Sequence, residues 1–160
     1  MASNRNRVAL MGRIRSGKTT LMQCLQQKEL KYAKTQQVTY TDNFIDTPGE
    51  FIEMSIFSHQ AVSVSLDSAL IIMVSSCVDT MNSIRPNFIS FFNVPAIGVV
   101  TKIDRRDDEK ADIARSHRYL EYAGIKKDKI FEVSSFSGEG IPELTEEIHR
   151  YLDVKDNIFR

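Results

Sequence analysis

Residues 8–19 have the sequence Val-Ala-Leu-Met-Gly-Arg-Ile-Arg-Ser-Gly-Lys-Thr, and this stretch decides the fold. Its first part, Val8 to Met11, is a short apolar run that predicts a buried strand. Residues 20–27, with leucines four positions apart, predict a helix. Between them, Gly12 to Thr19 fits the pattern of a glycine, four residues, and then Gly-Lys-Ser/Thr. In a strand–loop–helix setting this pattern binds nucleotide phosphates.

The physical basis of this phosphate loop is its backbone. Two glycines permit a turn in which successive N–H groups point inward, and the start of the following helix adds partial positive charge. We expect Lys18 to contact the β- and γ-phosphates and to assist catalysis, and the Thr19 hydroxyl to hold Mg²⁺. We assign to nucleotide binding Gly12, Arg15, Ser16, Gly17, Lys18, Thr19 and Thr20. The side chains of Arg13 and Arg15 are expected to face solvent or a partner.

Composition limits the class of protein. The 160 residues suit one domain, residues 1–160, and 21 basic residues balance 21 acidic ones. We therefore expect no nucleic-acid partner. The two cysteines form no CxxC motif, which favours a reducing cytoplasm. The longest apolar run, residues 69–74, is too short to cross a bilayer, so we expect no transmembrane segment.

Apolar runs alternate with helix-period stretches along the chain. This alternation predicts an α/β fold, in which an approximately six-stranded, mostly parallel sheet carries helices on both faces. The acidic residues 107–109 suit a helix start, and Gly124 suits the position just after that helix. We expect strands at 8–11, 38–40, 43–45, 69–74, 95–100 and 130–133, and helices at 20–27, 51–65, 84–92, 110–123 and 141–152.

A second phosphate element, Asp46-Thr47-Pro48-Gly49, follows the apolar pair at 44–45. Ligands of open α/β sheets bind at the carboxyl ends of the strands, which is where this aspartate is expected. A carboxylate there supports Mg²⁺, usually through water, and the N–H of Gly49 can contact the γ-phosphate.

The string Thr101-Lys102-Ile103-Asp104 follows the strand at 95–100 and predicts a guanine site. A carboxylate at Asp104 accepts hydrogen bonds from N1–H and the 2-amino group of guanine, which adenine cannot supply. The methylenes of Lys102 would cover the base. Threonine stands at position 101 in place of the commoner asparagine, so we expect a weaker tether to the phosphate loop.

The last predicted strand ends in Ser134-Ser135-Phe136. The usual element at this place is Ser-Ala-Lys or Ser-Ala-x, whose backbone N–H groups meet the guanine O6. Ser134 and Ser135 match it, with serine replacing alanine and Phe136 replacing lysine. We therefore add Ser134 and Ser135 to the expected nucleotide site.

These four elements, in this order, resemble the small Ras-like GTPase domains of the translation-factor and Era/TrmE type over essentially the whole chain. Residues 34–36, 44–51 and 138–140 are similar to the EutP/PduV family of ethanolamine- and propanediol-utilisation operons. The resemblance implies a P-loop GTPase fold with GTP or GDP and Mg²⁺ as cofactors. It also implies a cytoplasmic protein associated with a bacterial microcompartment, with a shell protein or an activating protein as partner.

The resemblance also implies functional roles for two further residues, Thr35 and Glu50. Thr35, in the polar stretch 29–37, is the expected switch threonine and Mg²⁺ ligand, with Thr39 and Thr41 as rivals in a predicted strand. Glu50 stands where many relatives place a glutamine that orients water. An ionised glutamate cannot donate to phosphate oxygens, so Glu50 either accepts a proton from water or stabilises the start of the following helix. We accordingly expect slow hydrolysis that a partner or a cation completes.

Three functions remain open from the sequence. The leading hypothesis is a molecular switch that binds GTP and hydrolyses it to GDP and phosphate. The first alternative is a nucleotide-dependent kinase of a small carboxylate such as acetate, although no motif builds an acetate pocket. The second alternative is a microcompartment scaffold that binds nucleotide without hydrolysing it.

Overall fold

The computed structural model describes residues 6–27, 37–41, 43–53, 58–82 and 84–152. Its centre is a six-stranded sheet in the order β2-β3-β1-β4-β5-β6. Five of these strands run parallel, and only the short edge strand β2 pairs antiparallel, with β3. The predicted mostly parallel sheet is therefore confirmed. The strands are β1 (Val8–Gly12), β2 (Thr39–Tyr40), β3 (Phe44–Asp46), β4 (Leu70–Ser76), β5 (Ala96–Thr101) and β6 (Ile130–Glu132).

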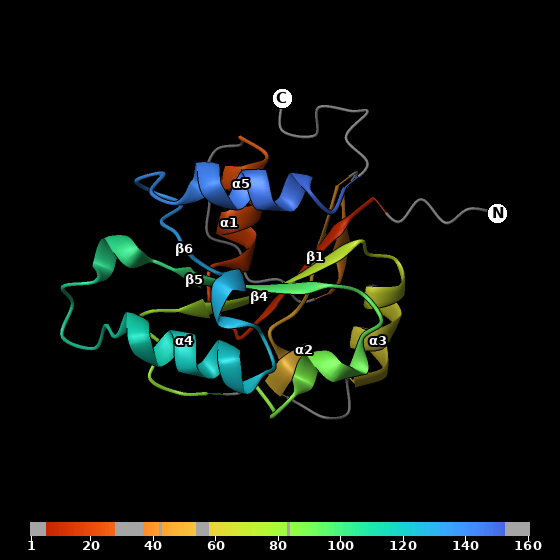
Figure 1. Cartoon of the computed structure of the whole chain (residues 1–160), viewed down its shortest axis with the longest axis horizontal. Coiled ribbons are helices and arrows are strands. Elements are labelled where there is room, and N and C mark those ends of the chain that lie inside the picture. The colour runs from red at the N-terminus through yellow and green to blue at the C-terminus, as the bar shows by residue number, and fades with distance from the viewer. Residues whose placement is uncertain (1–5, 28–36, 42, 54–57, 83, 153–160) are drawn as a thin grey trace.

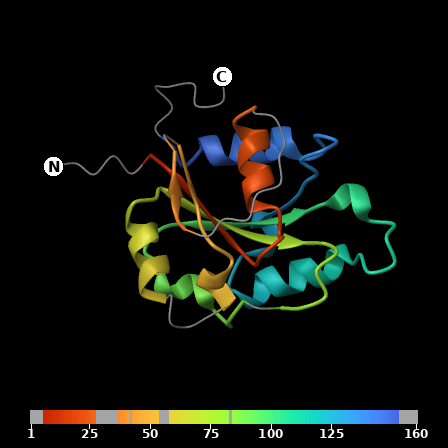
Figure 2. The ribbon, with the colours of Figure 1, turned by 180° about the vertical axis from the view of Figure 1, so that it is seen from behind.

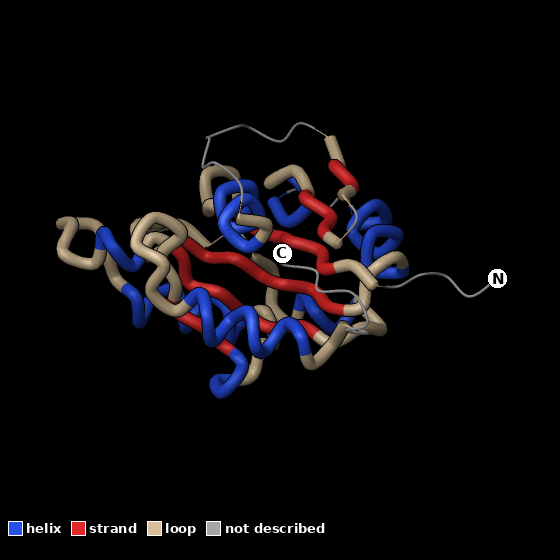
Figure 3. The backbone as a smooth tube through the Cα atoms, turned by 90° about the horizontal axis from the view of Figure 1, so that it is seen from above, coloured by secondary structure: helices blue, strands red, loops and turns tan. Residues whose placement is uncertain are grey.

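Helices cover both faces of the sheet, as predicted. In Figure 1, α1 (Lys18–Leu25) and α5 (Ile141–His149) lie above the strands, and Figure 2 shows the same arrangement from behind. The opposite face carries α2 (Glu50–Glu53), α3 (Ser58–Leu66) and α4 (Ile113–Tyr122). Figure 3 shows the molecule from above, from the side of α1 and α5, with the strands running side by side across it. Within the described ranges, no helix is long and apolar enough to span a membrane.

The alternating side chains of the strands divide the core in two. In β4, Ile71 and Met73 face the cluster under α2, α3 and α4, whereas Leu70, Ile72 and Val74 face α1 and α5. All five are at most 1% exposed. Each such burial stabilises the fold by about 1.5–3 kcal/mol, so the sheet is anchored from both sides and presents its carboxyl-end loops on a rigid base.

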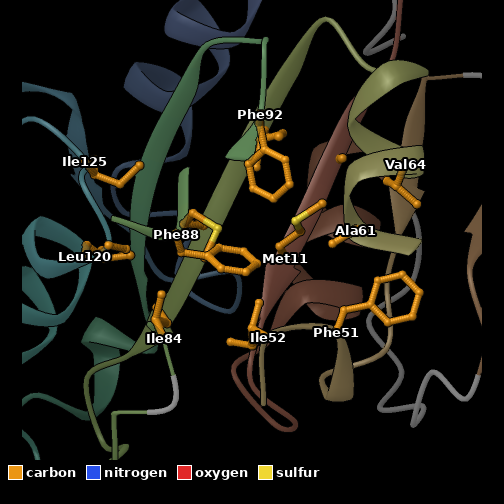
Figure 4. Packing of buried hydrophobic residues seen from close by; sticks show 14 of the residues in the cluster. Met11, Phe51, Ile52, Ala61, Val64, Ile84, Phe88, Phe92, Leu120 and Ile125 are labelled. Atoms are coloured by element: carbon orange, nitrogen blue, oxygen red, sulfur yellow. The ribbon is translucent and has the colours of Figure 1, made fainter. Parts of the chain in front are cut away.

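The helix predicted over 84–92 is wrong. A 3-10 helix spans only Phe88–Phe91, because Asn87 has the left-handed backbone angle φ 51 and cannot continue an α-helix. The side chains of Phe88 and Phe92 pack in the hydrophobic core. Phe88 is 1% exposed and its ring lies edge-on to that of Phe92, with centroids 5.2 Å apart (Figure 4).

Helix boundaries show two further differences from expectation. The acids at 107–109 do not begin α4. Its N-cap is Asp112, whose side chain accepts a hydrogen bond from the Arg115 backbone N–H at 2.9 Å. Gly124 follows this helix with φ 107, as predicted. The expected helix 51–65 appears as α2 and α3, and residues 54–57 between them lie outside the described ranges.

Candidate nucleotide site

The loop between β1 and α1 is closed around its lysine. The Lys18 ammonium donates to the carbonyl oxygens of Gly12 at 2.6 Å and Arg13 at 2.8 Å, and the side chain is buried. Gly17 has φ 92, a left-handed conformation that favours glycine. A Cβ on Gly12 would lie 2.6 Å from the Val74 carbonyl of the neighbouring strand. The loop thus has the curled backbone that phosphate binding requires.

Thr19 and Asp46 meet at the carboxyl edge of the sheet, as the metal prediction requires. The Thr19 hydroxyl donates to Asp46 Oδ2 at 2.5 Å, and Asp46 is 2% exposed. Asp46 ends β3, which pairs with β1, and the adjacent Thr47 hydroxyl anchors the segment by donating to the Leu10 carbonyl at 2.7 Å.

This pair fits Mg²⁺, which prefers hard oxygen ligands and usually needs only one or two from protein. Across the described residues, no group of three or more His, Cys, Asp or Glu side chains could hold a metal. A magnesium ion beside Thr19 and Asp46 would therefore complete its coordination with water and phosphate oxygens.

Gly49 packs directly on the phosphate loop. A Cβ at this position would collide with the backbone and side chain of Ile14, so a larger residue would push the two loops apart. Glu50 is the first residue of α2, the place where an acidic residue favours a helix start. Its role in catalysis stays a prediction.

The predicted switch threonine, Thr35, lies outside the described residues. Of its two rivals, Thr39 lies in β2, as expected of a strand residue. The Thr41 hydroxyl contacts the backbone of Phe44 within the turn that leads to β3. The choice among the three therefore stays a prediction.

The loop after β5 is tied to the phosphate loop at two points. The Thr101 hydroxyl donates to the Ser16 carbonyl, and both residues are buried. Lys102 donates from its ammonium to the Arg15 carbonyl at 2.6 Å. The expected tether of residue 101 is therefore a direct contact of the threonine hydroxyl, and its weakness relative to asparagine stays a prediction.

Asp104 is held beside the last strand. The Ser134 hydroxyl donates to Asp104 Oδ1 at 2.8 Å. Arg106 pairs with Glu139 at 2.5 Å and so also joins the loop after β5 to the loop after β6. Ser134 is buried and Asp104 is exposed. The carboxylate is therefore oriented by one partner and remains accessible to another.

Together these contacts bring the predicted residues to one edge of the sheet. The loops that hold Lys18, Asp46, Thr101 and Ser134 all follow the carboxyl ends of parallel strands. Thr20 is partly buried in the first turn of α1, and Ser135 is partly buried beside Ser134. The contacts of their backbone groups with a nucleotide stay predictions.

Three contacts of this edge were missed from the sequence. Asp79 pairs with Arg13 of the phosphate loop at 2.6 Å, but it belongs to no motif and follows β4 without a local signal. The Arg106–Glu139 pair spans 33 positions and has no sequence signature. Thr47 lies inside a motif, so its anchoring role could have been anticipated.

The fold defined by this sheet, loop order and site is that of P-loop GTPases. The Roco2 RocCORdC structure from Methanosarcina barkeri bound to GDP matches with a TM-score of 0.62 and 20% identity. Era from Aquifex aeolicus bound to GDP·AlF4⁻ matches equally well, with the same TM-score and identity. Each match covers 94% of this chain, which spans only 51% and 57% of those two chains.

The chain belongs to the PduV-EutP family of ethanolamine and propanediol utilisation, whose pattern matches residues 5–150. The propanediol utilization protein PduV of Citrobacter freundii is 30% identical over 138 residues, which cover 86% of this chain and 89% of the relative. A protein named probable acetate kinase EutP from Escherichia coli K12 is 28% identical over 142 residues, or 88% and 87%. The predicted family is confirmed.

Proposed function

We propose that the protein, as a single domain over residues 1–160, binds guanine nucleotide with Mg²⁺ and hydrolyses GTP slowly in ethanolamine or propanediol utilisation. One observation carries this proposal: Thr101 and Lys102 bond the carbonyls of Ser16 and Arg15. This fixes the expected base-binding loop against the phosphate loop. A nucleotide is the ligand class with a base at one end and phosphates at the other.

Guanine selectivity follows from the chemistry of Asp104. Its Oδ1 already accepts from Ser134, which orients the carboxylate and leaves further acceptor sites. Guanine offers two donors in the matching order, whereas adenine offers an acceptor at N1. A carboxylate that the bound base covers without offering donors is costly, so adenine nucleotides should bind far more weakly.

Phosphate binding would use groups that the loop now satisfies internally. Lys18 would exchange the carbonyls of Gly12 and Arg13 for the β- and γ-phosphates, and the Thr19 and Asp46 oxygens would face the metal. Bound Mg²⁺ would neutralise charge on these phosphates. Thr35 and Gly49 are the proposed contacts with the γ-phosphate. The loops that hold these two residues would therefore differ between the GTP and GDP forms.

Hydrolysis should be slow without help. Glu50 lies at the start of α2 and, when ionised, has no proton to donate to a phosphate oxygen. We expect an unaided turnover below about 1 s⁻¹, at the low edge of ordinary enzymes. A microcompartment shell protein or an activating protein is the proposed partner, and the cytoplasm, at a bacterial microcompartment, is the proposed location.

The name of the Escherichia coli relative supports a second candidate, phosphoryl transfer to acetate. The two candidates differ in their products and in whether the reaction requires acetate. A GTPase releases free phosphate whether or not acetate is present, whereas a kinase forms acetyl phosphate only with acetate.

The test incubates purified protein with GTP or ATP and Mg²⁺, with and without acetate, and measures free phosphate and acetyl phosphate in single-turnover mode. GTP-dependent phosphate release that Lys18→Ala abolishes and Asp107→Asn preserves would support the proposal. Acetyl phosphate formation would favour the kinase. Tight GTP binding with no turnover would leave the non-hydrolysing scaffold.

A further inference from the structure

A pocket of about 480 Å³ opens beside the phosphate loop. It lies among three segments: the phosphate loop, the end of β4 with the residues after it, and the loop after β5. Four of its side chains are basic and one is acidic. The lining residues are Arg13, Ile14, Arg15, Ser76, Val78, Asp79, Lys102 and Arg105.

Most of the groups assigned to the nucleotide's phosphates and base lie outside the lining of this pocket. Lys18, Thr19 and Asp46, which form the phosphate and metal corner, are absent from its described lining, as are Asp104 and Ser134. The two sites share a wall, because Arg15 and Lys102 line the pocket and are also assigned to the nucleotide site. The other two basic residues of the pocket, Arg13 and Arg105, have no assigned role in nucleotide binding.

Three of the four basic side chains have partners before any ligand arrives. Arg13 is paired with Asp79 at 2.6 Å. Arg105 is paired at 2.7 Å with Asp108, which is not among the lining residues. Lys102 is fixed by the Arg15 carbonyl at 2.6 Å. Because these side chains are already ordered, the binding of an anion would cost little side-chain conformational entropy.

The cations also repel one another. The pKa of Lys102 is lowered, first by burial and next by the positive charge of Arg105, and Arg15 adds to the effect. Asp79 is the one acidic side chain among those that line the pocket in the described structure. An anion at this place would relieve the repulsion and would gain charge-assisted hydrogen bonds.

We propose that this pocket binds a small molecule through a dianionic phosphate group, as a second anion site next to the nucleotide site. Its volume falls in the range of about 300–1,000 Å³ of small-ligand pockets. Guanidinium groups match phosphate geometry, and two fixed arginines favour a dianion over a singly charged carboxylate. The inference goes beyond the proposed function, because the ligand would be held in addition to the nucleotide.

The test is a titration with inorganic phosphate at constant ionic strength, followed by backbone amide chemical shifts. It is run on protein saturated with GDP, so that the phosphate loop is filled. We expect saturable shifts at Arg13, Val78 and Asp79. Acetate, the monoanionic probe, should bind more weakly than phosphate.

The variant Arg13→Gln/Arg105→Gln removes two cations that have no assigned role in nucleotide binding. It should weaken phosphate binding by about tenfold or more and leave GDP affinity unchanged. Arg118→Gln is the matched control, since Arg118 is exposed on α4 away from the pocket lining. This control should bind phosphate as the natural protein does.

Three results would overturn the proposal: no saturable phosphate binding in GDP-saturated protein, equal phosphate affinity in the double variant, or acetate binding as tightly as phosphate. A parallel loss of GDP affinity in the double variant would also overturn it, by assigning the pocket to the nucleotide. If GDP does not bind at all, the proposed function fails. The second site is then tested alone by phosphate titration of Lys18→Ala.

Discussion

Asp104 is the residue on which nucleotide selectivity depends. Asp104→Asn keeps the size of the side chain and an oxygen that can accept from Ser134. The new amide, however, presents a donor where guanine also presents donors. We expect GDP affinity to fall about 10- to 100-fold, the loss expected for hydrogen bonds to a charged group, when measured by calorimetric titration.

Asp107→Asn is the matched control for this change. Asp107 is exposed three positions further along the same loop, so the variant removes an equal charge with no expected contact to the base. Equal losses of GDP affinity in both variants would show that the effect is general electrostatics. That result would remove Asp104 from the base site.

At the residue scale, the motifs were informative because each requires a particular backbone and a particular side chain. The Lys18 ammonium is held by the Gly12 carbonyl, and the Thr19 hydroxyl contacts Asp46 of the second motif, whereas their contacts with phosphate and metal stay predictions. Asp79 could not be found this way, since its contact with Arg13 joins residues 66 positions apart through the sheet. Only the register of β1 against β4 brings them together.

Among the elements, α4 begins with a capping contact that can be tested directly. Asp112→Ala removes the side-chain acceptor of the Arg115 N–H, an N-cap whose loss costs about 0.5–2 kcal/mol. We expect this decrease in the free energy of unfolding by urea denaturation. Asp107→Ala, in the acidic run that does not cap the helix, should stay within about 0.5 kcal/mol of the natural protein.

The contact between Lys129, which directly precedes β6, and Glu147 of α5 should give the protein a pH-dependent stability. The pKa of Glu147 is lowered, first by the hydrogen bond from Lys129 and also by Tyr151 and Arg150. A lowered pKa in the folded state means that the stabilisation is present above the unfolded pKa, about 4.3 for glutamate. It is lost as pH falls through the folded pKa.

The variant Glu147→Gln tests the contribution of the Lys129–Glu147 ion pair. The variant should unfold more easily at pH 7, and its difference from the natural protein should shrink as pH falls below about 4. Glu146→Gln is the adjacent control, with a side chain that is 75% exposed. Thermal unfolding across pH measures both, and a Glu147→Gln difference that is constant with pH would exclude the ion pair as its source.

At the scale of elements, periodicity was reliable where one helical face is buried and unreliable where aromatic residues dominate. The pattern in 84–92 is apolar enough for a helix, but Asn87 turns the chain and Phe88 fills the core as part of a short 3-10 turn. The helix predicted at 141–152, by contrast, appears as α5, with Pro142 in its first turn and Leu144 and Ile148 buried on one face.

For the whole molecule, the parallel sheet accounts for the site. Five strands point their carboxyl ends to one edge, so loops from distant parts of the sequence meet there. The alternation of strands and helices predicted this edge. The sequence also predicted a tether between Thr101 and the phosphate loop, but not the contact of Lys102 with the Arg15 carbonyl, which depends on side-chain packing across 87 positions.

The central claim is that one guanine nucleotide contacts the phosphate loop and Asp104 at the same time. An amide chemical-shift titration of labelled protein with GDP and Mg²⁺ tests it most directly, with ADP as the comparison. We predict that residues 15–19 and 102–104 shift with a single midpoint, and that ADP reaches this midpoint only at a much higher concentration. Shifts confined to residues 15–19, or equal midpoints for GDP and ADP, would contradict the claim.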